Sequence, residues 1–133
     1  MGVIFDTSEI ISLERKAGSI EEMVGSRRNE PCAISVITVA ELLHGVERAD
    51  SQARKLSRQA FVERAIDFFP VVPFDTPVAR IYARLWASLA AQGILVGTHD
   101  LIIAATALSL DFTIITANMR DFGKIEGLRV EKF

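Results

Sequence analysis

Cysteine is almost missing from this sequence of 133 residues, which contains only Cys32. A single cysteine cannot form an intrachain disulfide, and the apolar neighbours Ala33 and Ile34 predict that its thiol is buried. This favours a protein of a reducing compartment, the cytoplasm. Histidine is also scarce, with only His44 and His99, so no set of Cys and His side chains has the spacing of a zinc site.

Long hydrophobic runs and a large net charge are absent as well. The longest apolar runs, such as residues 101–110, contain Thr and Ser and are shorter than the roughly 18 to 20 residues that a bilayer requires, so no membrane span is expected. The formal net charge of −2 excludes the strongly basic surface of a protein that coats nucleic acid by charge alone. Any contact with nucleic acid is therefore expected to be local.

Motifs for two kinds of chemistry are also missing. The sequence has no P-loop, no G-x-G-x-x-G fingerprint and no well-placed Ser-His-Asp or Cys-His set, so nucleotide binding and covalent catalysis lack support. The composition is that of a compact protein, with 50% hydrophobic and 24% charged residues. No repeat, low-complexity tract or linker divides the chain, so we expect one domain over residues 1–133.

Short apolar runs alternate with helical patterns along the chain. The runs predict strands at residues 3–5, 32–37, 69–74, 112–115 and 128–131. Helices are predicted at residues 8–16, 39–49, 51–68, 77–91 and 99–110, the last two with Thr76 and Thr98 as N-caps. This alternation predicts an α/β fold with a parallel sheet and helices on both of its sides. Such sheets bind their ligands beyond the carboxyl ends of the strands.

Two acidic residues follow predicted strands. Asp6 comes directly after residues 3–5, and Asp121 lies shortly after residues 112–115, with Thr116 and Asn118 beside it. Each acid also has a purely structural explanation, because Asp6 can cap the next helix and the spacing of Asn118 and Asp121 is common in turns.

Two further acids are predicted in the first turns of helices. Glu41 follows Thr38 with the spacing of a capping box, and Asp100 is favoured near a helix start by the helix dipole. Both residues therefore have a stabilising explanation too. The helix that follows Asp100 is rich in alanine, so it can approach the sheet closely and fix Asp100 relative to Asp6.

All four acids are expected at the same edge of the predicted sheet. Carboxylates gathered in one crevice repel each other, and a divalent cation with oxygen ligands keeps them ionised. Mg²⁺ or Mn²⁺ is the natural choice for such ligands. The sequence therefore predicts a metal site formed by Asp6, Glu41, Asp100 and Asp121.

Four segments together resemble the PIN-domain family, most closely its VapC-type toxin ribonucleases from bacterial toxin–antitoxin pairs. They are residues 3–8 around Asp6, residues 35–43 around Glu41, residues 99–108 around Asp100, and residues 116–122 around Asp121. The resemblance extends over almost the whole chain. The element Asp-x-x-Ile-Ala-Ala-Thr-Ala that begins at Asp100 is its most specific motif.

This resemblance implies a fold, a cofactor and an activity. The fold would be a three-layer α/β/α sandwich around a central parallel sheet of four to five strands. The cofactor would be Mg²⁺ or Mn²⁺, and the activity would be hydrolysis of RNA. Such an ion polarises a phosphate and lowers the pKa of a bound water. By matching position, Asp6 and Asp100 would be the main metal ligands, Glu41 a further ligand or a base that positions water, and Thr7 a supporting hydroxyl.

The fourth acid departs from the family pattern. Asn118 stands where many relatives have an acid, which leaves Asp121 as the nearest carboxylate and Thr116 and Asn118 as supporting residues. Arg120 is the candidate for holding a neighbouring phosphate of the RNA. The resemblance also implies two protein partners, a cognate antitoxin and a second copy of the chain in a homodimer.

Two other functions fit parts of the sequence. A receiver-like signalling domain would also gather acids at strand ends and accept a phosphoryl group, but it requires a paired acid near Asp6, and Glu9 lies too far along. It also requires an acid at the end of the middle strand, whereas Asp75 is better explained as the lead-in to the helix at Thr76 and Pro77. The second alternative is a PIN-like interaction module without catalytic activity.

Overall fold

The computed structural model describes residues 2–133, apart from the side chain of residue 26, and contains a five-stranded parallel sheet. The strands are β1 (Val3–Phe5), β2 (Cys32–Ser35), β3 (Val71–Val72), β4 (Thr113–Ile115) and β5 (Val130–Glu131). Their order in the sheet is β3-β2-β1-β4-β5, and every neighbouring pair is parallel. This confirms the predicted α/β class and the parallel sheet.

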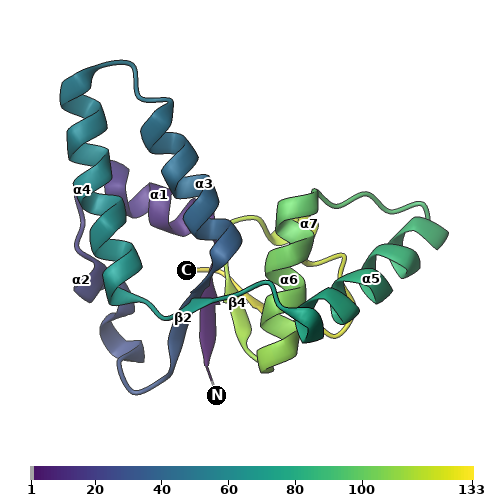
Figure 1. Cartoon of the computed structure of the whole chain (residues 1–133). Helices are drawn as coiled ribbons and strands as arrows, with labels where there is room; N and C mark the ends of the chain where they lie inside the picture. The colour runs from purple at the N-terminus through teal and green to yellow at the C-terminus, as the bar shows by residue number, and fades with distance from the viewer. Residues whose placement is uncertain (1) are drawn as a thin grey trace.

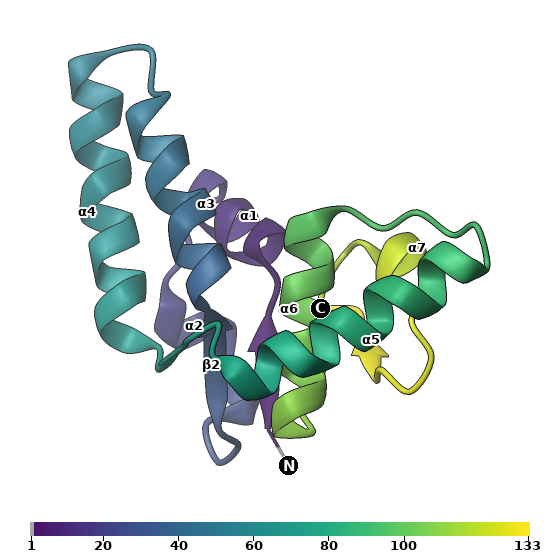
Figure 2. The same cartoon turned by 45° about the vertical axis from the view of Figure 1, so that its right-hand side comes forward.

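The helices flank the sheet in two groups (Figure 1; Figure 2). They are α1 (Thr7–Arg15), α2 (Ile20–Val24), η1 (Gly25–Arg27), α3 (Val36–Glu47), α4 (Gln52–Phe68), α5 (Thr76–Ala91), α6 (Thr98–Leu110) and α7 (Met119–Phe122). No helix of residues 2–133 has both the length and the apolar character needed to span a membrane.

The side chains of β1 point alternately to the two faces of the sheet, and each face has its own hydrophobic core. Val3 and Phe5 pack on one face with α1 to α4, whereas Ile4 packs on the other with α5 to α7. A strand buried on both faces must be apolar throughout, which explains the continuous run of hydrophobic residues. The two cores and the sheet between them form the predicted three-layer α/β/α sandwich.

Helix α6 is almost entirely buried at its centre. Ala104, Ala105 and Ala107 have no exposed surface, and Ile103 beside them is equally buried. Small side chains let this helix lie close to the sheet, as the sequence predicted, and its first turn is thereby held near the carboxyl ends of the strands.

The helix starts differ from the predicted ones. Ser35, not Thr38, caps α3, because the Ser35 hydroxyl accepts a hydrogen bond from the Ile37 amide at 3.1 Å. The predicted capping box is therefore wrong, and strand β2 ends before residues 36 and 37. Asp75 likewise caps α5 in place of Thr76, and α6 begins after Gly97 without a side-chain cap, with Thr98 as its first residue.

Two other expectations need correction. The predicted strands at residues 69–74 and 128–131 are shorter in the structure, which pairs only Val71–Val72 and Val130–Glu131 with the sheet. Cys32 is half-buried and not fully buried, although burial still raises the pKa of its thiol.

Candidate metal centre

The site lies where β1 and β4 end side by side. Phe5 and Ile115 are register partners in the parallel pair, and the residue that follows each strand is polar, Asp6 after β1 and Thr116 after β4. The Asp6 amide donates to the Ile115 carbonyl at 3.0 Å, so the pairing continues to the point where the side chains face the crevice. Neighbouring parallel strands thus bring together residues that are far apart in the sequence.

Asp6 is buried, with only 4% of its surface exposed, and protein groups donate hydrogen bonds to both of its carboxylate oxygens. Its Oδ1 accepts from the Thr7 amide at 2.8 Å, and its Oδ2 accepts from the hydroxyls of Ser8 and Thr116, each also at 2.8 Å. The first bond caps α1, so the capping role and the site role coexist in one side chain. Hydrogen bonds of this kind stabilise the ionised form of a buried carboxylate.

Glu41 points from the second turn of α3 toward α1 and α6. The Thr7 hydroxyl donates to its Oε1 at 2.6 Å, and the Thr7 oxygen lies 2.9 Å from the hydroxyl of the fully buried Thr38. Its Oε2 lies 3.3 Å from Nδ1 of His99. Thr38 therefore orients Thr7 in the site instead of capping the helix, and Thr7 donates to Glu41.

Asp100 in the first turn of α6 carries the clearest electrostatic signal. Burial raises the pKa of its carboxyl group to about 6, with further contributions from the negative charges of Asp6, Glu41 and Asp121. His99 opposes this shift. The other three acids predicted from the sequence therefore lie close enough to Asp100 for their charges to act on it.

Asn118 links the fourth acid to the rest. Its Nδ2 lies 3.4 Å from an oxygen of Asp100 and 3.3 Å from an oxygen of Asp121, and its amide donates to the Thr116 hydroxyl. Hydrogen bonds from Asn118 and Lys124 lower the pKa of the Asp121 carboxyl group. Asp121 is thus already compensated by a cation, unlike Asp100.

Two further residues near the site, Glu9 and Lys124, were not predicted as site residues, and the predicted Arg120 makes few contacts. Glu9, one turn after Asp6, has its pKa raised by burial and then by Asp6, and its spacing from Asp6 was the available signal. Lys124 donates to both the Leu95 carbonyl and Asp121, a contact that sequence spacing does not reveal. Arg120 is exposed on α7 and its charge acts on Asp121.

The donor set fits a hard dication in its chemistry. Among residues 2–133, no three acidic, histidine or cysteine side chains lie close enough to chelate an ion in their present orientations. The carboxylates are near enough to repel but are turned toward Thr7, Thr116 and Asn118. Oxygen atoms dominate the set, and its unrelieved negative charge is what Mg²⁺ or Mn²⁺ neutralises in proteins.

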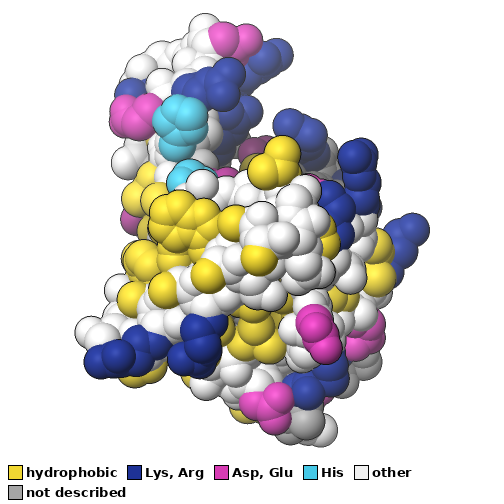
Figure 3. Space-filling model, turned by 90° about the vertical axis from the view of Figure 1, so that its right-hand side faces the viewer, with side chains coloured by type: hydrophobic (Ala, Val, Ile, Leu, Met, Phe, Trp, Pro, Cys, Tyr) yellow, Lys and Arg dark blue, Asp and Glu magenta, His cyan; other side chains and the backbone are white. Residues whose placement is uncertain are grey.

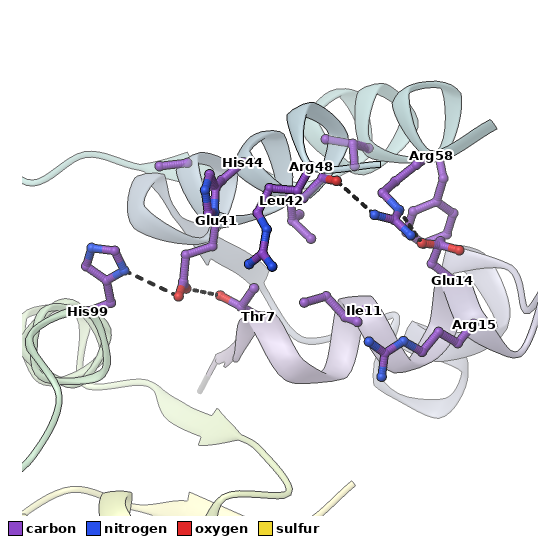
Figure 4. Close-up of a pocket in the computed structure, with 14 residues that line it drawn as sticks. Thr7, Ile11, Glu14, Arg15, Glu41, Leu42, His44, Arg48, Arg58 and His99 are labelled. Carbon is purple, nitrogen blue, oxygen red and sulfur yellow. Dashed lines mark hydrogen bonds and ion pairs between the residues drawn. The ribbon is translucent and has the colours of Figure 1, made fainter. Parts of the chain in front are cut away.

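A groove of about 720 Å³ leads away from this centre between α1, α3 and α4. Figure 4 shows Glu41, Thr7 and His99 at one end of it and the ion pair of Arg58 with Glu14 at the other. Its remaining lining combines apolar side chains with the guanidinium groups of Arg15 and Arg48. The centre is therefore accessible to a ligand larger than a metal ion.

Comparison with known sequences gives a consistent result over nearly the whole chain. The family model of the PIN domain matches residues 3–128. The chain is 39% identical over 130 residues to Ribonuclease VapC1 of Rickettsia felis, an alignment that covers 98% of this chain and 95% of the relative. It is 34% identical over 122 residues to the tRNA(fMet)-specific endonuclease VapC of Salmonella typhimurium, with 92% and 89% covered.

Solved structures agree with the sequence matches. VapBC2 from Rickettsia felis, bound to a DNA fragment from the promoter, superposes with a TM-score of 0.87 at 25% identity and covers 100% of this chain and 99% of that one. DNA-bound VapBC from Salmonella typhimurium also gives 0.87, at 32% identity, with 99% and 98% covered. PIN-domain nucleases of this kind generally depend on divalent metal ions.

Proposed function

Since this chain belongs to the PIN-domain family and is similar along its length to VapC ribonucleases, we propose that it is the RNA-cleaving toxin of a toxin–antitoxin pair. The reaction is hydrolysis of a phosphodiester bond within RNA. The acidic cluster at the carboxyl ends of β1 and β4 carries it, because it combines hard oxygen ligands with unrelieved negative charge.

The cofactor in this proposal is Mg²⁺ or Mn²⁺. Asp6 and Asp100 are the main ligands, with Glu41 as a further ligand or a base that orients water, and Asp121 as a weaker candidate. A bound ion of this kind lowers the pKa of a water molecule and polarises the phosphate. The observation that supports this assignment most strongly is the pKa of Asp100, which burial and then the neighbouring carboxylates raise to about 6.

The supporting residues hold the ligands and the substrate. Thr116 donates to Asp6, and Thr7 donates to Glu41, so both fix the direction in which a carboxylate presents its free lone pairs. Asn118 donates to Asp100 and occupies the place of a fourth acid without adding charge. Arg120 is exposed beside Asp121 and holds a phosphate next to the one that is cleaved.

The partners follow from the same relatives. We assign the chain a cognate antitoxin protein, since its solved neighbours are toxin–antitoxin complexes, and a place in the cytoplasm where RNA is available. Hydrophobic side chains are exposed on the face seen in Figure 3. Tyr82 on α5 packs between the exposed rings of Phe74 and Trp86, with 5.8 Å between centroids in both pairs. This aromatic surface is our candidate for the homodimer contact.

The test is cleavage-site mapping on total RNA with Mg²⁺, with Mn²⁺ and with EDTA. Asp6→Asn and Asp100→Asn should each abolish metal-dependent cleavage and growth inhibition, while circular dichroism shows that both variants remain folded. Asp67→Asn, on the exposed side of α4, is the matched control and should cleave like the wild type. Wild-type cleavage by Asp6→Asn would refute the assignment.

The same experiment addresses the alternatives. Membership of the PIN-domain family removes the basis for a receiver-like domain. An interaction module without catalytic activity would leave total RNA intact in every metal condition.

A further inference from the structure

We propose that His99 is a positioning residue that fixes the carboxylate of Glu41 relative to Asp100. The inference deepens the proposed nuclease function and rests on it. Its basis is a contact between two helices that lie on opposite sides of the sheet, α3 and α6 (Figure 1). Residues 41 and 99 are 58 positions apart in the sequence, so only the fold brings them together.

Glu41 is held from two directions. The Thr7 hydroxyl donates to Oε1 at 2.6 Å, and Nδ1 of His99 lies 3.3 Å from Oε2. Figure 4 shows Thr7 and His99 reaching the carboxylate from different elements. Because a carboxylate only accepts hydrogen bonds, Nδ1 of His99 carries the hydrogen in this contact. Each oxygen keeps a further lone pair that is free to bind an ion or a water molecule.

Thr7 alone leaves one oxygen of Glu41 without a donor. The Glu41 side chain is long and 31% exposed, so rotation about its terminal bonds would carry Oε2 into the groove. His99 prevents this rotation, and it is the residue next to Asp100 in the first turn of α6. The contact therefore sets the separation of two proposed ligands that belong to different helices.

This role differs from that of a stabilising ion pair. The side chain of His99 is 56% exposed, and exposed pairs contribute little to stability. Loss of the contact should therefore leave the unfolding midpoint almost unchanged. It should instead affect metal affinity and the rate of the chemical step, because partners that orient metal ligands typically contribute about 10- to 100-fold to affinity or activity.

Two substitutions at position 99 separate the hydrogen bond from the ring. His99→Asn places an amide nitrogen close to the position of Nδ1 and keeps the donor, whereas His99→Phe keeps a ring of similar size without a donor. Asp67→Asn is again the control, because Asp67 is exposed on α4 and does not line the groove.

The experiment measures Mn²⁺ binding by calorimetry, kcat and KM for RNA cleavage, and thermal unfolding. We expect His99→Phe to weaken Mn²⁺ binding and lower kcat by about tenfold each with KM little changed, and His99→Asn to stay within about threefold of the wild type. Asp67→Asn should match the wild type.

Three results would overturn the inference: no effect of His99→Phe, equal losses in His99→Phe and His99→Asn, or a change confined to KM, which would mean that His99 contacts RNA. A wild-type protein that binds no Mn²⁺ and cleaves no RNA would refute the proposed function itself. That outcome is distinct, because it does not depend on any substitution at position 99.

Discussion

Replacing Asp100 by Asn should stabilise the metal-free protein at neutral and alkaline pH while removing its activity. In the folded state the pKa of Asp100 is about 6, mainly because the group is partly buried and then because Asp6 and Glu41 lie nearby. An unfolded chain restores the ordinary value of 3.8. The folded state therefore binds more protons than the unfolded state between these values, and its stability falls as the pH rises through that window.

The size of the effect follows from the same shift. Raising the pKa from 3.8 to about 6 corresponds to about 3 kcal/mol of unfavourable free energy for the ionised form. Asp100 is only half-buried, so water screens part of this interaction, and we expect about 1.5 kcal/mol. For a domain of 133 residues this is an increase of about 5 °C in melting temperature. Asn118 donates toward Asp100, and the amide oxygen of the new side chain accepts that bond equally well.

The assay is thermal unfolding in EDTA at about pH 8 and about pH 4, for the wild type, Asp100→Asn and the surface control Asp67→Asn. The gain of Asp100→Asn should be present at the higher pH and mostly lost at the lower one, where the wild-type carboxyl group is protonated in the folded state and only partly ionised in the unfolded state. An equal gain at both values, or no gain at the higher one, would mean that the ionised Asp100 carboxylate is not what raises the free energy of the folded state. Asp67→Asn should show neither change.

Two further substitutions test the local structure. Thr116→Val removes the hydroxyl that donates to Asp6 at 2.8 Å, and it should lower the rate of single-turnover RNA cleavage by about 10- to 100-fold. Thr116→Ser keeps the hydroxyl and should retain most of the rate. Equal rates in the two variants would contradict this prediction. Ser35→Ala removes the N-cap of α3 and should lower the free energy of unfolding in urea by about 1 kcal/mol, with an unchanged value as the contrary result.

The strands and the acidic edge could be predicted because local sequence determines them. Val3, Ile4 and Phe5 are apolar in succession, which is sufficient to identify a strand that is buried on both faces. Asp6 directly follows that strand, and a parallel sheet places every such residue at the same edge. The order of the strands and the positions of the acids in the sequence were therefore sufficient to predict that the acids lie close together.

The start of α3 could not be predicted in this way. Ser35 and Thr38 are both good N-caps and stand three residues apart, so local rules favour either. Thr38 is buried because α1 packs over it and Thr7 bonds to it, and this depends on a contact across 31 residues. The contact of His99 with Glu41 and that of Lys124 with Leu95 likewise arise from the packing of separate helices and loops.

The position of β4 in the sheet also affects when activity can begin during synthesis. This strand lies beside β1 near the middle of the sheet, yet its residues, Thr113–Ile115, follow almost all of the other elements along the chain. A nascent polypeptide that has emerged only as far as α6 already displays Asp6, Glu41 and Asp100 but has neither the hydroxyl of Thr116 nor the amide of Asn118 to orient them. A translating ribosome would thus carry an unassembled nuclease until synthesis has passed β4, which delays any attack on RNA by the newly made protein.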